Sequence, residues 1–185
     1  MRCTGTGSSC TDFDAGGNQV VPSTIVRDPN MPNAMNASQI ARFKSDAQSA
    51  GTYYTSCPSS LAGTVVFIDV SATTECQDQN GATYNSASSP GIVIMPRGTM
   101  RIKGTFYGVV YLGNEQATSG TVLTLASNSQ VFGGVAVDGA GRLEVGSASG
   151  NRATIEFASY AFDALASFGT TGLVQNTWRE LPPNG

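Results

Sequence analysis

The chain has 185 residues, enough for one domain with a buried core, and its formal net charge is −3. Charged residues make up 12% of the chain, about half the usual share, and 22 glycines contribute to a surface that is polar without being charged. The sequence has no His, and its densest basic group is only Arg97, Arg101 and Lys103. This composition argues against nucleic-acid binding and excludes His-dependent catalysis.

Four cysteines lie in the first half of the chain, at Cys3, Cys10, Cys57 and Cys76. An even count without His and without a CxxC spacing favours disulfides over a zinc site, and therefore an oxidising compartment. Nearness in the sequence favours the pairs Cys3–Cys10 and Cys57–Cys76 among three pairings, and four reduced thiols are the alternative. No signal peptide is visible, so an exported protein would need an N-terminal segment that this chain lacks.

Residues 1–35 are expected to form an irregular, disulfide-containing N-terminal segment, in which Pro and Gly mark turns. Asp12, Asp14 and Asn18 are spaced as in a calcium loop, but Ser23 stands where that loop needs a Glu. We interpret these residues as a solvated turn and predict no metal site.

Residues 36–62 are expected to form a helix and a connector that pack on, or cap, the following strands. The helix begins at Asn36 or Ser38 as the N-cap and ends at Gly51. Its apolar stripe is narrow, which is typical of a helix that covers a larger element.

Residues 63–157 contain short apolar runs of four to seven residues separated by Gly, Asn or Ser turns. Two interleaved series of runs emerge. One has members at 92–94, 109–111, 135–137 and 154–156. The other has members at 100–102, 122–124 and 143–145, and places Arg101, Val122 and Leu143 each 21 residues apart.

A coil length near twenty residues predicts an all-β fold, a right-handed parallel β-solenoid in which each coil lies on the previous one. An antiparallel sandwich is the alternative, although no Asn-Gly or Asp-Gly hairpin joins matched neighbouring strands. Residues 104–116 and 129–141 share a similar order of aromatic, Gly and β-forming residues. This similarity predicts that Phe106 and Phe132 stack on each other, and that Gly108 and Gly134 mark turns.

Residues 158–185 are expected to form a short helix, over 160–169, and an extended C-terminal tail. The only Trp of the chain, Trp178, lies in this tail and is expected to pack along the side of the solenoid.

Candidate catalytic carboxylates are Asp69, Asp138, Glu144 and Glu156, but no pair is fixed by spacing. Asp69 and Asp138 end strands, where ordinary turn carboxylates also lie. We therefore predict no enzyme activity and no cofactor, and keep a polysaccharide-active enzyme as an alternative.

Glycan or ice binding is a further alternative. A glycan-binding strip could be made from Tyr53, Tyr54, Phe106, Tyr107, Tyr111 and Phe132, although such aromatic side chains more often fill a core. Thr99, Thr105, Thr121 and Thr124 do not recur at one coil period, which disfavours an ice-binding face.

Five segments carry a resemblance to a known family: NASQIARFKSDAQSAGTYYTS, LAGTVVFIDV, GIVIMPRGTMRIKGTFYGVVYLG, VFGGVAVDGAGRLEVGS and WRELP. Their order resembles the extracellular β-solenoid domain of bacterial PilX-type, type IV pilus-associated proteins, and the Gly-Val rungs are also similar to those of bactofilins.

The resemblance implies a non-enzymatic structural or adhesive role at the bacterial cell surface. Its partners would be other pilus or envelope proteins, or further copies of itself, without nucleic acid. The membrane would be reached only through a pilin-like N-terminal segment absent from this chain. A self-assembling filament subunit is the rival interpretation, which a flat apolar terminal coil would favour.

Overall fold

The computed structural model describes residues 33–79, 81–148 and 151–167, together with the backbone of three short strands near the N-terminus. The chain divides into two compact units, Met1–Pro32 and Asn33–Gly185. In the first unit, β1 (Arg2–Cys3), β2 (Cys10–Phe13) and β3 (Gln19–Val20) form an antiparallel sheet that places Cys3 opposite Cys10. The predicted Cys3–Cys10 bond and the side chains of Asp12, Asp14 and Asn18 lie outside what the structure describes.

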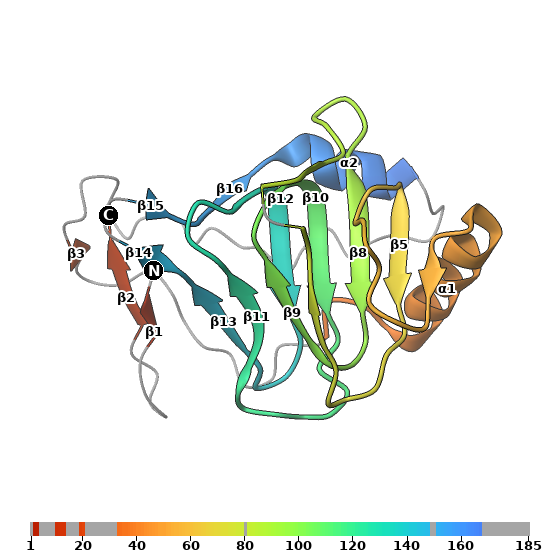
Figure 1. The fold of residues 1–185 in the computed structure, drawn as a ribbon, viewed down its shortest axis with the longest axis horizontal. Coiled ribbons are helices and arrows are strands. Elements are labelled where there is room, and N and C mark those ends of the chain that lie inside the picture. Colours follow the sequence, from red (N-terminus) through yellow and green to blue (C-terminus); the bar gives the residue numbers. More distant parts are fainter. Residues whose placement is uncertain are drawn as a thin grey trace, which may run out of the picture. The chain divides into compact units, whose positions relative to one another are not determined.

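The helix α1 (Ala37–Ala50) has the ends that the sequence predicts. Asn36 is the N-cap: its side chain accepts from the backbone N–H of Gln39, while the Gln39 side chain accepts from the backbone N–H of Asn36. Gly51 ends the helix in the left-handed conformation, with φ 71°. This helix packs on β4 and β5 at the N-terminal end of the solenoid (Figure 1).

The second unit is a parallel β-solenoid of about four turns, so the prediction of this fold is confirmed. The order in its larger sheet is β16 (Thr154–Phe157), β12 (Gln130–Val137), β10 (Thr105–Leu112), β8 (Gly91–Met95), β5 (Val65–Ile68) and β4 (Tyr53–Tyr54), with β7 (Thr83–Tyr84) also beside β10. The smaller sheet has the order β13 (Arg142–Val145), β11 (Thr121–Leu125), β9 (Thr99–Ile102) and β6 (Glu75–Gln77).

Every described pairing within these two sheets is parallel, which overturns the antiparallel sandwich. A separate antiparallel hairpin, β14 (Ser147–Ala148) and β15 (Asn151–Arg152), precedes β16. The strands of the two main sheets therefore run from Tyr53 to Phe157, so β4 lies ahead of the range 63–157 expected for the solenoid, in the stretch expected to be a connector.

Two apolar layers stabilise this unit because the larger sheet is buried on both faces. Inward side chains such as Val66, Val93 and Val110 fill the interior of the coils. Outward side chains such as Phe67 and Ile94 form a second layer that α1 and α2 (Ser159–Ser167) cover. The helix α2 confirms the predicted short C-terminal helix, whereas residues 168–185, including Trp178, are not described.

The register differs from the prediction in both series. Met100 pairs with Leu123 and Leu123 with Leu143, steps of 23 and 20 residues, and a bulge lies between Thr121 and Leu123. The uniform step of 21 was therefore wrong. In the larger sheet Val109 pairs with Gly134 rather than Val135, and Thr154 pairs with Gln130.

The predicted stacking of Phe106 on Phe132 is also wrong by one position. Phe132 pairs with Tyr107, and their rings stack with centroids 4.8 Å apart. Phe106 points into the interior and pairs with Val131. One residue matters here because neighbouring side chains on a strand point to opposite faces.

Gly108 and Gly133, not Gly134, are the equivalent glycines, and they lie inside β10 and β12 rather than at turns. Their φ angles are 140° and 146°. A Cβ on Gly108 would stand 1.8 Å from the carbonyl oxygen of Gly91 in the neighbouring coil. The glycines therefore form a column in which the backbones approach too closely for any side chain.

No described helix is long and apolar enough to cross a membrane.

Candidate functional site

Charged side chains line one edge of the larger sheet, where its strands end. Asp69 follows β5, Arg97 follows β8, Glu115 follows β10 and Asp138 follows β12. Because these strands are parallel and hydrogen-bonded in that order, their carboxyl ends meet at the same edge. We call these four residues the strand-end row.

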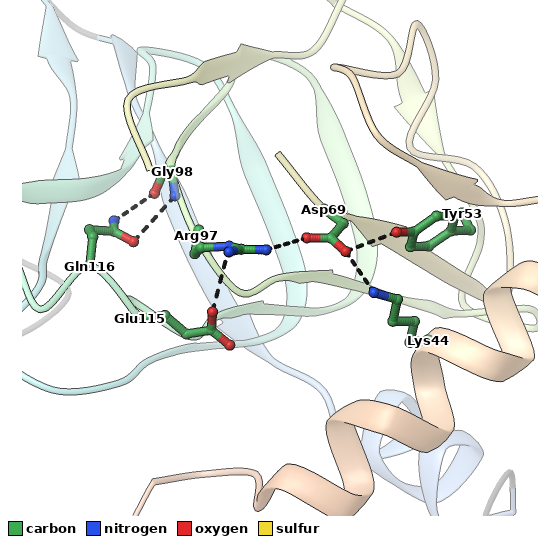
Figure 2. A network of polar contacts seen from close by, with 7 residues as sticks. All are labelled: Lys44, Tyr53, Asp69, Arg97, Gly98, Glu115 and Gln116. Atoms are coloured by element: carbon green, nitrogen blue, oxygen red, sulfur yellow. Dashed lines mark hydrogen bonds and ion pairs between the residues drawn. The ribbon is translucent and has the colours of Figure 1, made fainter. Parts of the chain in front are cut away.

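Asp69 lies at the centre of a polar network (Figure 2). Its Oδ2 accepts from the Nζ of Lys44 at 2.7 Å and from the hydroxyl of Tyr53 at 2.8 Å. Its Oδ1 accepts from the Nη2 of Arg97 at 2.7 Å. The carboxylate thus joins the helix α1, the edge strand β4 and the loop after β8.

These contacts determine the charge of Asp69. The hydrogen bond from Lys44 is the main cause that lowers the pKa of Asp69, from 3.8 to about 2, with help from Tyr53 and Arg97. The same hydrogen bond raises the pKa of Lys44 above its usual value. A carboxylate that is ionised at all ordinary pH values, with both oxygens occupied, is a poor proton acceptor in catalysis.

The loop after β10 extends the network to the next coil. Glu115 pairs with the Nε of Arg97 at 3.6 Å, and both side chains are about half exposed. The side chain of Gln116 makes two hydrogen bonds to the backbone of Gly98 (Figure 2). Its Nε2 donates to the carbonyl oxygen of Gly98 at 3.0 Å, and its Oε1 accepts from the amide of Gly98 at 3.3 Å. The loop of residues 114–120, between β10 and β11, is thereby fixed to the preceding coil.

Asp138, the third strand-end carboxylate, is buried and makes its hydrogen bonds to other partners than Asp69 does. It accepts from the hydroxyl of Tyr111 and, at 3.0 Å, from the backbone N–H of Ala34. Burial, and then the bond to Asp138, raise the pKa of Tyr111 far above its usual value. Asp138 therefore fastens the segment before α1 onto the third and fourth coils.

Asp78 is a buried carboxylate that the sequence analysis did not single out. Its two oxygens accept from the backbone amides of Lys103 and Gly104, at 2.6 and 3.0 Å. Burial is the main cause that raises its pKa, against the lowering effect of these hydrogen bonds. Its place in the polar loop before β7 resembles that of any turn residue, so no local pattern distinguishes it.

The remaining candidates are spread over the solenoid. Glu144 pairs in register with Thr124, and Glu156 with Phe132, both in exposed strands. Arg101 lies in β9 of the smaller sheet and Lys103 directly follows that strand, whereas Arg97 follows β8 of the larger sheet. Within residues 33–79, 81–148 and 151–167, no three acidic or cysteine side chains are grouped as a metal ion would need.

The proposed aromatic strip is not continuous. Phe106 and Tyr111 are buried, at 0% and 1% exposure, and Tyr54 packs against the interior cluster. Tyr53 leans on Phe67, with ring centroids 5.9 Å apart. Of the six residues considered for the strip, only Tyr107 and Phe132 stack on each other.

The threonines form no regular row either. Thr124 pairs with Arg101 and Glu144, and Thr105 with Thr83 and Gln130. This irregularity disfavours a repeated binding face.

The predicted bond between Cys57 and Cys76 is confirmed as a disulfide. Cys76 lies in β6 with its side chain buried, whereas Cys57 lies in the exposed connector after β4. The bond fixes the connector to the first coil. A disulfide of this kind is typical of oxidising compartments.

Chemically, the strand-end row provides fixed charge pairs rather than a reactive group. Sequence reasoning found Asp69 and Asp138 but missed Arg97 and Lys44 as partners of Asp69. The available signal was the shared position of Asp69 and Arg97 just after two buried strands, which parallel pairing brings together. No protein-family model, no curated protein and no solved structure matches the chain.

Proposed function

We propose that this chain is a non-enzymatic structural or adhesive module of a bacterial, type IV pilus-associated, minor pilin-like protein at the cell surface. The observation that carries the proposal is the order of motifs that resembles the PilX-type solenoid. Four of those five segments now correspond to one packed unit, from α1 through β4, β5, β8 and β10 to β13.

Two structural features support a passive scaffold. The described strand-end carboxylates Asp69 and Asp138 are occupied by partners from their own chain. The disulfide between Cys57 and Cys76 fits a protein that is exported to an oxidising environment. Partners would then be pilus or envelope proteins that contact the loops and coil surfaces.

The test is made in the source bacterium. Deletion of the gene should reduce the number of surface pili or the adherence of cells, and the full-length protein should appear in the sheared surface fraction. Complementation with the Gly108→Ala variant, whose solenoid should not fold, should fail to restore piliation and adherence, whereas the wild-type gene should restore both. Retention in the cytosol, unchanged piliation and adherence, or purified protein that degrades a polysaccharide would each contradict the proposal.

A filament subunit is the second candidate because the last coil exposes Leu143, Val145, Ile155 and Phe157. Head-to-tail stacking would also need an open first coil. The interior residues of that coil, Leu61, Val66 and Ile68, are at most 3% exposed. Electron microscopy of concentrated protein tests this candidate, and concentration-dependent fibres would favour it over the module.

A further inference from the structure

The C-terminal end of the solenoid is apolar and open in the part of the chain that the structure describes. All exposed large hydrophobic side chains among the described residues lie there: Leu143 at 37%, Val145 at 46%, Ile155 at 39% and Phe157 at 72%. The first three stand opposite fully buried residues of the previous coil, namely Leu123, Leu125 and Val131. They therefore occupy interior positions that nothing described covers.

The backbone is open at the same end. In the described residues β13 pairs only with β11, and β16 only with β12. The amides of Arg142 and Gly146 donate to the β11 side, and those of Thr154 and Ala158 to the β12 side. Because amides alternate in direction along a strand, those of Leu143, Val145, Ile155 and Phe157 face away from the stack.

The opposite end shows how this chain closes a coil. There β4 pairs with β5, α1 packs beside both strands, and the interior of the first coil is buried. An uncovered strand edge with apolar neighbours favours association and aggregation. The asymmetry indicates that a cover is needed at the C-terminal end too.

We propose that residues 168–185 of this same chain close the last coil, laying an apolar segment over its interior and pairing with its open strand edge. This segment carries Leu173, Val174, Trp178 and Leu181, with only Arg179 and Glu180 charged. It starts after α2, which packs on β12, β10 and β8. From β8 the open end is about 15 Å away at the usual strand spacing, and 18 extended residues reach about 60 Å.

A second copy of the chain is a weaker occupant. The open edge consists of β13 and β16, eight residues in all, whereas a stable interface takes about 20–30 residues a side. A tethered segment needs no such area because its effective concentration is in the millimolar range for short linkers.

Hydrogen exchange of the backbone amides, measured on the full chain by NMR, tests the proposal. If the segment pairs with β13, the outward amides of Leu143 and Val145 should be protected, and if it pairs with β16, those of Ile155 and Phe157. The protected amides should exchange at least about tenfold more slowly in the full chain than in a variant that ends at Ser167. The inward amides of Arg142 and Thr154 should change less. The amides of β8 serve as the control that both proteins remain folded.

A full-length variant with Leu173, Val174, Trp178 and Leu181 replaced by Ser guards against a truncation that fails to fold. It should lose the same protection and bind more of a hydrophobic dye. Outward amides that exchange freely in the full chain would overturn the proposal. So would protection that survives both changes, or protection that rises with protein concentration, which would indicate a second copy.

Discussion

The guanidinium of Arg97 lies 2.7 Å from the carboxylate of Asp69, although 28 positions separate the two residues in the sequence. Parallel pairing brings them together, because Phe67 pairs with Ile94 and both strands end just afterwards. Since Lys44 of α1 contacts the same carboxylate, one side chain joins the helix to two successive coils.

Replacing Asp69 by Asn should destabilise the solenoid by about 1–3 kcal/mol, because Lys44 and Arg97 lose a charged acceptor and Asn offers only one good acceptor oxygen. Urea unfolding at pH 7 measures this change. Glu115→Gln is the matched control: its pair with Arg97 is longer and more exposed, so the loss should stay below about 0.5 kcal/mol. Equal effects of the two changes would show that Asp69 has no special role.

Acid should weaken the same network. The pKa of Asp69 is depressed from 3.8 to about 2 in the folded chain, so its contribution is full above about pH 4 and disappears as the pH falls towards 2. After allowance for the exposed partners, the wild type should lose about 1–2 kcal/mol more than Asp69→Asn between pH 5 and pH 2. The measurement is the free energy of unfolding of both proteins between pH 2 and pH 5. Parallel curves of this free energy against pH would contradict the prediction.

The elements that local chemistry determines could be predicted from the sequence. Asn36 and Gly51 delimit α1 because capping depends on side chains within a turn of the helix end. The short apolar runs predicted the strands, and their recurrence predicted stacked coils. The bond between Cys57 and Cys76 followed from their nearness in the chain.

The register and the partners of the strand-end row could not be predicted. A bulge between Thr121 and Leu123 shifts one coil, and a repeat counted along the chain does not reveal it. The sequences around Phe106 and Phe132 look alike, but the two residues are not paired. The close approach of Gly108 to Gly133 sets a register in which Phe132 pairs with Tyr107. Lys44 reaches Asp69 through tertiary packing, which leaves no local pattern, and the position of Arg97 after β8 indicates Asp69 as its partner only once the register of β5 and β8 is known.

Gly108→Ala should disrupt the solenoid, because a methyl group would collide with the backbone of Gly91 and also force an unfavourable φ. We expect a loss above about 3 kcal/mol, or no folded protein. Gly51→Ala is the matched control, since Gly51 also has a positive φ but has open space around its Cβ position. That change should cost about 1 kcal/mol, and thermal unfolding of both variants compares them. A Gly108→Ala protein as stable as Gly51→Ala would refute the close approach.

The disulfide should stabilise the first coil by restricting the unfolded chain. Cys57 and Cys76 are 19 positions apart, and a loop of this size predicts a loss of about 3 kcal/mol when both are replaced by Ala. Denaturant unfolding of this double variant, beside the wild type with and without reductant, measures the effect. Reduced wild type should match the double variant within about 1 kcal/mol, apart from the small cavity that Cys76→Ala leaves in the interior. If reduction left the unfolding midpoint unchanged while mass measurement showed the Cys57 and Cys76 thiols freed, the bond would have no part in holding the connector to β6.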